Sequence, residues 1–253
     1  MILAIDAGNS RTKWAVFGES DEVQAQGVIS NSELHESTVP DAWQPCRRAV
    51  ISNVAGEEIR RSLTSLLQQR SISTSWVKAS AHACGVINSY DFPERLGTDR
   101  WVALIAAWQQ FRAPCVVVNA GTALTVDALV VNENGQGIFL GGLIVPGLRL
   151  MQQSLVGAAA GIKGAGGSLQ YFPSTTENAI HTGALSAMAG AVNSMLVKLE
   201  LHTGQSPHCI VSGGDAALMQ EMLVHYRVGK IVMAENLVLQ GLLLLEKEMG
   251  KGA

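Results

Sequence analysis

The sequence contains few charged and few aromatic residues. Of its 253 residues, 15% are charged and 5% are aromatic, whereas 47% are apolar. With a formal charge of −3 and a pI of about 6.1, the chain lacks the basic excess with which proteins usually bind a nucleic-acid backbone. The apolar residues are mainly aliphatic and are accompanied by 26 glycines, which is typical of a layered α/β protein with a large core.

Several motifs of common enzyme classes are also missing. No G-x-x-x-x-G-K-[ST] segment occurs, which excludes a P-loop nucleotide site. Neither H-E-x-x-H, a comparable metal cluster nor a G-x-S-x-G nucleophile elbow is present. The four cysteines form no C-x-x-C pair, so we expect free and mostly buried thiols in a reduced protein: Cys46, Cys84, Cys115 and Cys209.

Targeting and membrane segments are not expected either. No apolar run reaches the length of a membrane span, and the N-terminus has neither a basic region nor a cleavage site. We therefore expect a cytoplasmic protein that binds neither membranes nor nucleic acids.

The same strand–turn–strand pattern occurs twice in the chain, once at the N-terminus and once near its middle. Residues Ile2–Asp6 and Cys115–Asn119 are apolar strands that end in a polar residue, and each is followed by a glycine turn and a second strand. A third strand candidate follows in each case, at Val23–Ile29 and Gly137–Ile144. The pattern predicts a duplicated α/β fold, with halves 1–114 and 115–253 and a cleft between them.

The remaining elements alternate between strands and helices. The predicted strands are Ala49–Val54, Ser73–Lys78, Cys209–Ser212 and Ile231–Met233, and the predicted helices are Glu57–Gln69, Asp99–Phe111, Leu148–Gly157, Thr176–Leu201, one from Asp215 onward, and Asn236–Met249. The segment Gly157–Ser168 is rich in Gly and Ala, which favours either a mobile lid or a plain connector.

The first candidate site is the turn Asp6–Lys13. An Asp at the end of a buried strand needs a partner, and a Mg²⁺ ion carried by a nucleotide is a suitable one. Gly8 allows close approach of a phosphate, Asn9 and Ser10 can donate to its oxygens, and Lys13 adds a positive charge. An ordinary β-hairpin turn explains the same residues equally well.

Two further turns favour the phosphate interpretation. Asn119–Thr125 repeats the first turn in the second half, so the two turns could hold one polyphosphate from both sides. Ser212–Asp215 contains Gly213 and Gly214, against which a flat nucleoside could lie, although such a pair is often only a turn.

The third site is Gly97–Arg100. Phosphoryl transfer to an alcohol requires a carboxylate near the hydroxyl, which Asp99 could supply, and Arg100 could bind a substrate carboxylate. The alternative is that Asp99 is a helix N-cap with a surface ion pair to Arg100.

Together these motifs resemble the type III pantothenate kinase family. Its D-x-G-N-[ST]-x-x-K, G-x-D-R and D-x-G-T-A-x-T motifs match Asp6–Lys13, Gly97–Arg100 and, except at the first position, Asn119–Thr125. The family's G-G-x-I-x-P-G, T-x-x-A-[IV]-x-x-G and L-x-x-x-G-L patterns match Gly141–Gly147, the helix from Thr176, and the segment from Leu237 to Leu242.

The resemblance implies ATP-dependent phosphorylation of pantothenate, the first step toward coenzyme A. It implies two RNase-H-like halves of the actin-like ATPase superfamily, in a homodimer whose Thr176 helix reaches the partner's site. Asp99 would be the catalytic base, and Asp6 would lie at the Mg²⁺–ATP site. The implied ATP-binding residues are Asp6, Ala7, Gly8, Asn9, Ser10, Arg11, Thr12, Lys13 and Thr122, and the implied pantothenate-binding residues are Tyr90, Gly97, Thr98, Asp99, Arg100 and Thr176.

One position departs from the family pattern. Asn119 stands where the family usually has an Asp that helps bind a monovalent cation, K⁺ or NH₄⁺. An amide oxygen carries no net charge, so the cation requirement is expected to be weaker.

Three other hypotheses remain. The chain could be a kinase for another small alcohol, an ATP-binding accessory protein without activity, or a polymerising actin-like scaffold. The presence of both Asp6 and Asp99 argues against the second hypothesis, and a short chain without extra insertions argues against the third. The helix from Thr176 could pack against a second subunit through Ala184, Ala187, Ala189, Ala191, Val192 and Leu196, or against its own sheet.

Overall fold

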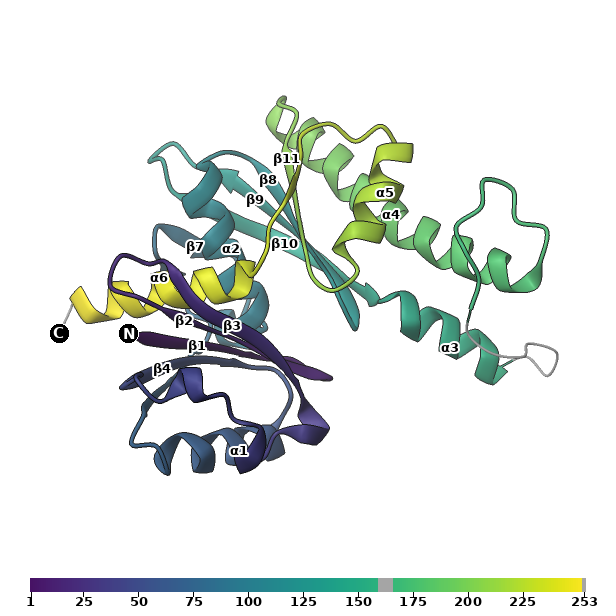
Figure 1. The fold of residues 1–253 in the computed structure, drawn as a ribbon. Coiled ribbons are helices and arrows are strands. Elements are labelled where there is room, and N and C mark those ends of the chain that lie inside the picture. Colours follow the sequence, from purple (N-terminus) through teal and green to yellow (C-terminus); the bar gives the residue numbers. More distant parts are fainter. Residues whose placement is uncertain (159–165, 252–253) are drawn as a thin grey trace. The chain divides into compact units, whose positions relative to one another are not determined.

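The computed structural model describes residues 1–158 and 166–251 (Figure 1). The chain forms two compact units. The first comprises Met1–Gln109 and Leu237–Ala253, and the second comprises Gln110–Asn236.

The first unit contains a five-stranded mixed sheet in the order β3-β2-β1-β4-β5. Its strands are β1 (Ile2–Ala7), β2 (Arg11–Phe17), β3 (Val23–Ser30), β4 (Arg48–Asn53) and β5 (Ser73–Trp76). β1–β2 and β2–β3 pair antiparallel, whereas β1–β4 and β4–β5 pair in parallel. The parallel pairing brings the ends of β1 and β4 to the same edge, where the first candidate site lies.

The second unit repeats this topology. Its strands are β8 (Cys115–Ala120), β9 (Ala123–Val131), β10 (Gly137–Pro146), β11 (His208–Ser212) and β12 (Ile231–Met233), in the order β12-β11-β8-β9-β10. β8–β9 and β9–β10 are antiparallel, and β8–β11 and β11–β12 are parallel. Relative to its first strand, each unit therefore has the same order and the same directions, which confirms the predicted duplication.

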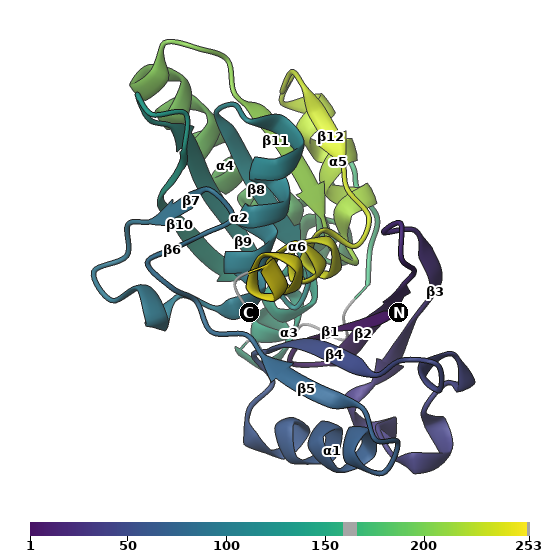
Figure 2. The same cartoon turned by 90° about the vertical axis from the view of Figure 1, so that its left-hand side faces the viewer.

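Helices cover the first sheet on both faces. α1 (Glu57–Gln68) buries Leu63, Leu66 and Leu67 in the core that β1, β2 and β4 line, and α6 (Leu237–Lys251) packs on β1, β2 and β4 (Figure 2). α2 (Thr98–Phe111) and α6 cross closely, because a Cβ on Gly241 would overlap the Val102 carbonyl. Since α6 packs with the first sheet, the compact units differ from the expected division at residue 114.

Three consecutive side chains of α6 anchor it to different parts of the first unit. Glu246 pairs with Arg48 of β4, and Lys247 pairs with Asp21 of the β2–β3 turn. Glu248 accepts hydrogen bonds from the N–H of Cys84, at 2.8 Å. Cys84 lies in the turn between the short strands β6 (His82–Ala83) and β7 (Val86–Asn88).

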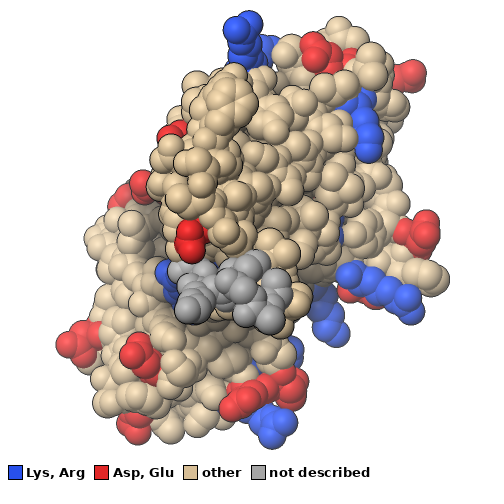
Figure 3. Space-filling model, turned by 90° about the vertical axis from the view of Figure 1, so that its right-hand side faces the viewer, with Lys and Arg blue, Asp and Glu red and all other residues tan. Residues whose placement is uncertain are grey.

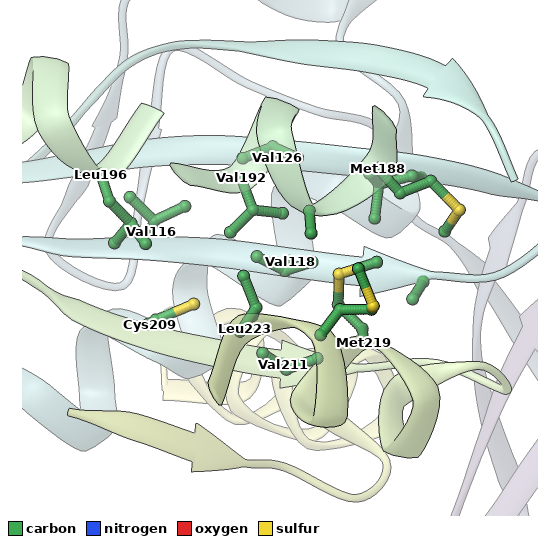
Figure 4. Close-up of a cluster of buried hydrophobic side chains, with 14 of the residues drawn as sticks. Val116, Val118, Val126, Met188, Val192, Leu196, Cys209, Val211, Met219 and Leu223 are labelled. Carbon is green, nitrogen blue, oxygen red and sulfur yellow. The ribbon is translucent and has the colours of Figure 1, made fainter. Parts of the chain in front are cut away.

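The second unit buries two helices against one face of its sheet. α4 (Thr176–Thr203) and α5 (Ala216–His225) place apolar side chains on β8, β9 and β11, as Figure 4 shows for Met188, Val192, Met219 and Leu223. α3 (Leu148–Ala158) packs on α4 and β10. Of the α4 residues proposed for a dimer contact, four lie in this core: Ala184, Ala189, Val192 and Leu196. For these four, packing against the chain's own sheet is the correct alternative.

All predicted strands and helices are present, with ends displaced by at most a few residues. Within residues 1–158 and 166–251, the unpredicted elements are β6, β7 and four short 3₁₀ helices: η1 (Asn31–Glu33), η2 (Glu36–Thr38), η3 (Asp41–Trp43) and η4 (Pro93–Arg95). Such two- or three-residue elements have no periodic pattern. The expected loop Gly157–Ser168 lies largely outside the described residues, and its first two residues belong to α3. The four cysteines are free and three are buried, as expected.

The expectation about membrane length needs a correction. α4 is long and apolar enough to cross a membrane by length and composition, with a mean hydropathy of 1.2 over 18 residues, of which 33% are buried. A core helix passes the same test, and α4 packs on β8 and β9. On the face shown in Figure 3, charged side chains of both signs are scattered among uncharged residues.

Candidate active site

The turn between β1 and β2 carries the first set of predicted residues. Leu3, Ala4 and Ile5 are buried, and Asp6 follows them near the end of the strand, paired with Lys13 of β2. The N–H of Gly8 donates to the Arg11 carbonyl at 3.1 Å, closing a tight turn with exposed residues at its tip. The expected hairpin is therefore present, and it presents Asn9, Ser10 and Arg11 to solvent, whereas Ala7 and Thr12 are buried.

Asp6 lies in an unfavourable electrostatic environment. The pKa of its carboxyl is raised from 3.8 to about 7, mainly by burial and also by the negative charge of Asp99, and Lys13 only partly offsets these two effects. Within the described residues, Asp6 Oδ1 is buried without a hydrogen-bond partner. A buried carboxylate oxygen without a partner is well suited to a cation.

The start of α2 brings the second set of residues to the same place. The carbonyl of Gly97 accepts the N–H of Trp101 at 3.0 Å, so Gly97 caps the helix and Asp99 lies in its first turn. Asp99 is thus not the N-cap, although its Oδ1 accepts the N–H of Arg100 at 2.8 Å. Burial raises the pKa of Asp99, while this hydrogen bond and the Arg100 charge act in the opposite direction. The Thr98 hydroxyl contacts that of Ser52 at 2.8 Å.

Arg100 and Tyr90 form a pair in the first unit. Arg100 is only 5% exposed, so the surface ion pair of the alternative hypothesis is wrong. Its Nη1 donates to the Tyr90 hydroxyl at 2.9 Å, and its guanidinium carbon lies 5.7 Å from the centre of the Tyr90 ring. Because a guanidinium binds carboxylates through two parallel hydrogen bonds, this position suits an anionic substrate group.

The turns of the second unit converge through their backbones. The Gly147 N–H donates to the Thr122 carbonyl at 3.0 Å, and the Asp215 N–H donates to the Ala120 carbonyl at 3.0 Å. Gly213 has a φ of 105°, and a Cβ there would overlap the carbonyl of Ala120. The turn that follows β8 therefore lies beside the glycines at residues 147 and 213–214, as a backbone-lined nucleotide site requires.

The other predicted residues of the second unit lie at the ends of its elements. Asn119 is half-buried near the end of β8, where it pairs with Ser212 of β11 and Thr125 of β9. Thr122 is exposed at the tip of the β8–β9 turn. Thr176 is the exposed first residue of α4, just after the capping Thr175.

Two residues of this region were missed in the sequence. Ser52 pairs with Asp6 across the parallel β1–β4 ladder and is fully buried. Asn31, which follows β3, donates from Nδ2 to the Gly8 carbonyl at 2.7 Å and accepts the Thr12 hydroxyl at 2.9 Å, so it braces the β1–β2 turn. Both contacts join residues far apart in the chain, and only the strand register could have predicted them.

The donor groups fit a magnesium ion that is held mainly by a nucleotide. No group of three or more His, Cys, Asp or Glu side chains suited to a metal occurs in residues 1–158 and 166–251. Mg²⁺ in kinases is typically bound by one or two carboxylates and by substrate phosphates, so the partnerless Asp6 oxygen satisfies the protein's share.

Comparison with known proteins agrees with this geometry. The family model described as type III pantothenate kinase matches residues 2–198. A type III pantothenate kinase of Methylobacillus flagellatus is 45% identical over 248 residues, which cover 97% of this chain and 98% of the relative.

Two solved structures share the fold. One is a Campylobacter jejuni protein described as a Baf family transcriptional activator, with a TM-score of 0.62 and 20% identity over 98% of this chain and 99% of that one. The other, from Sinorhizobium meliloti and described as a 2-dehydro-3-deoxygalactonokinase, has a TM-score of 0.57 and 12% identity over 98% and 99%. The fold is that of actin-like and sugar-kinase ATPases, and the chain belongs to the type III pantothenate kinase family.

Proposed function

We propose that this protein transfers the γ-phosphoryl group of ATP to the primary hydroxyl of pantothenate, the first step of coenzyme A synthesis. The observation that carries the proposal is the placement of Asp6 and Asp99 at one edge of the first unit, with the pKa of both raised. Carboxyl groups with raised pKa values are common at functional sites, and here one would bind a cation and the other would accept a proton.

Asp99 acts as the base on the hydroxyl. Phosphoryl transfer has a loose transition state, so the base mainly orients the alcohol and takes its proton late. A raised pKa makes the carboxylate a better proton acceptor, and the N–H of Arg100 holds one of its oxygens in place at 2.8 Å.

Asp6 and the β1–β2 turn act on the nucleotide side. With a pKa of about 7, Asp6 is partly protonated at neutral pH when no cation is bound. The Mg²⁺ carried by ATP would supply positive charge at the phosphates, and the ionised Asp6 would help to hold it. Gly8–Lys13 and Thr122 supply backbone and side-chain donors to the phosphates. On binding of Mg²⁺–ATP, the Asp6 carboxyl would then release its proton to solvent near pH 7.

Pantothenate is a carboxylate, and its anionic end is assigned to Arg100. The Tyr90 hydroxyl contacts the same guanidinium. Gly97 and Thr98, which precede Asp99 at the start of α2, are the other proposed pantothenate-binding residues of this segment. Thr176, at the start of α4, would contact the pantothenate bound by the partner subunit of a homodimer. Asn119 offers only an uncharged amide oxygen to a monovalent cation, so the cation binds less tightly than it would with an Asp at this position.

A cytoplasmic homodimer is part of the proposal. Large apolar side chains remain exposed on α3, on α4 and in the segment before α4: Leu150, Leu155, Tyr171, Phe172, Val197 and Leu201. Tyr171 and Phe172 are 85% and 84% exposed and stack edge to face with ring centres 4.7 Å apart. Such side chains support a protein interface better than the buried α4 residues do.

The silent accessory protein is not favoured. Both carboxylates are present and the relatives are named as kinases, while the likeness to the Campylobacter protein, at 20% identity, concerns the fold alone. The direct test is a coupled assay of ADP release from Mg²⁺–ATP with pantothenate as acceptor. ADP release that depends on pantothenate supports the proposal. An equal rate of ADP release with another small alcohol would instead favour a kinase for that alcohol.

A further inference from the structure

Asn88 is a buried amide whose hydrogen bonds all go to the backbone of one loop and its neighbours. It is the last residue of β7 and is 5% exposed. Its Oδ1 accepts the N–H of Tyr90 at 3.1 Å, and its Nδ2 donates to the carbonyls of Ser80 at 3.2 Å and Pro93 at 3.1 Å. One side chain thus fixes the backbone before β6, at Tyr90 and at the start of η4.

These bonds define the geometry of the segment that leads from β7 to α2. Residues 89–97 contain only the short helix η4, so the segment has few hydrogen bonds of its own. The Asn88 amide uses one acceptor and both donors, which leaves it one favoured orientation. The bond to the Tyr90 N–H holds the backbone from which the Tyr90 side chain extends, and the hydrogen bond from Arg100 Nη1 to the hydroxyl then sets the direction of the ring.

We propose that Asn88 is a positioning residue for pantothenate, which acts by holding Tyr90 against Arg100. The inference rests on the proposed function. Asn88 Oδ1 holds the Tyr90 backbone, and the Tyr90 hydroxyl accepts from Arg100 Nη1 at 2.9 Å. The guanidinium orientation is therefore tied to a residue twelve positions earlier, which contacts neither the nucleotide turn nor the Asp99 carboxyl in any described hydrogen bond.

The substitution Asn88→Asp tests this with almost no change in volume. The carboxylate can still accept the Tyr90 N–H, but it faces the Ser80 and Pro93 carbonyls with oxygens only. We expect the KM for pantothenate to rise about tenfold or more, which corresponds to about 1.4 kcal/mol of lost binding. The kcat and the KM for ATP should stay within about twofold, because Asp99 and the β1–β2 turn keep their contacts.

Two further variants separate positioning from a general loss of stability. Asn132→Asp is the matched control, since Asn132 also accepts backbone N–H groups, from Asn134 at 3.0 Å and Gln136 at 2.9 Å, but in the β9–β10 turn of the second unit. It should leave both KM values unchanged. Tyr90→Phe removes the hydroxyl that accepts from Arg100 Nη1 and should also raise the KM for pantothenate. If Asn88 acts through Tyr90, the double variant Asn88→Asp with Tyr90→Phe should have a KM for pantothenate no higher than the higher of the two single-variant values.

The outcomes are distinguishable. A wild-type KM for pantothenate in a folded Asn88→Asp protein overturns the inference alone, as do additive effects in the double variant. If Asn88→Asp does not fold, Asn88→Ser replaces it with the same expected rise. A wild-type protein that does not phosphorylate pantothenate overturns the proposed function, and this inference with it.

Discussion

Replacing Asp6 by Asn should stabilise the protein without ligands while removing most of its activity. The pKa of Asp6 is raised from 3.8 to about 7, chiefly by burial. A carboxyl with a raised pKa in the folded state contributes stability that is fully present below pH 3.8 and is lost as the pH rises through about 7. The difference of about 3 pKa units, at about 1.36 kcal/mol each, sets a ceiling of about 4 kcal/mol on that loss.

Urea denaturation from pH 4 to pH 8 measures this effect. We expect the wild type to lose stability across that range by an amount on the order of 2 to 4 kcal/mol more than Asp6→Asn does. Asp41→Asn is the control, because Asp41 is exposed, and its curve should parallel the wild type. Saturating Mg²⁺–ATP should stabilise the wild type at pH 8 more than it stabilises Asp6→Asn, which keeps the other phosphate donors. Parallel pH curves for wild type and Asp6→Asn would show that the Asp6 carboxyl does not have a raised pKa in the folded protein.

Arg100, Asn119 and the exposed pair Tyr171 and Phe172 can each be tested by substitution. Arg100→Ala should raise the KM for pantothenate by about 10- to 100-fold with a smaller change in kcat, because the contact between the guanidinium and the substrate carboxylate is already present in the ground state. Steady-state kinetics measure both constants, and a fall in kcat with an unchanged KM would contradict this role. Asn119→Asp should lower the K⁺ concentration needed for half-maximal activity, and equal K⁺ titrations would exclude Asn119 as a ligand. Light scattering should give the mass of a dimer at micromolar concentration, which Tyr171→Ser with Phe172→Ser should reduce, whereas a stable wild-type monomer contradicts the interface.

The sequence predicted the duplicated sheets because each strand pair has a long apolar run and a glycine turn. It could not place α6, since Leu237 to Leu245 fits any apolar surface, and only tertiary packing assigns it to β1, β2 and β4. It also could not show that Ala184 and Val192 face the chain's own core rather than a partner, because both surfaces require the same small apolar residues.

The candidate site was predictable where residues are local and not where they are distant. Gly97–Arg100 and Asp6–Lys13 are continuous motifs, so the spacing alone identified them. Asn31 and Ser52 act through contacts to residues 19 or more positions away, which depend on strand register. Asn88 carries a weak local signal, because Asn often accepts the N–H two residues on, but that pattern occurs in many turns without a role in binding.

The most direct test of the account is the turnover of Asp99→Asn. Asn keeps an oxygen that can accept the N–H of Arg100, so the start of α2 should stay folded and the melting temperature should stay close to that of the wild type. Without a base, kcat should fall by about 10²- to 10⁴-fold, while the KM values for ATP and pantothenate change little. A kcat close to that of the wild type in the folded variant would contradict the assignment of Asp99 as the base.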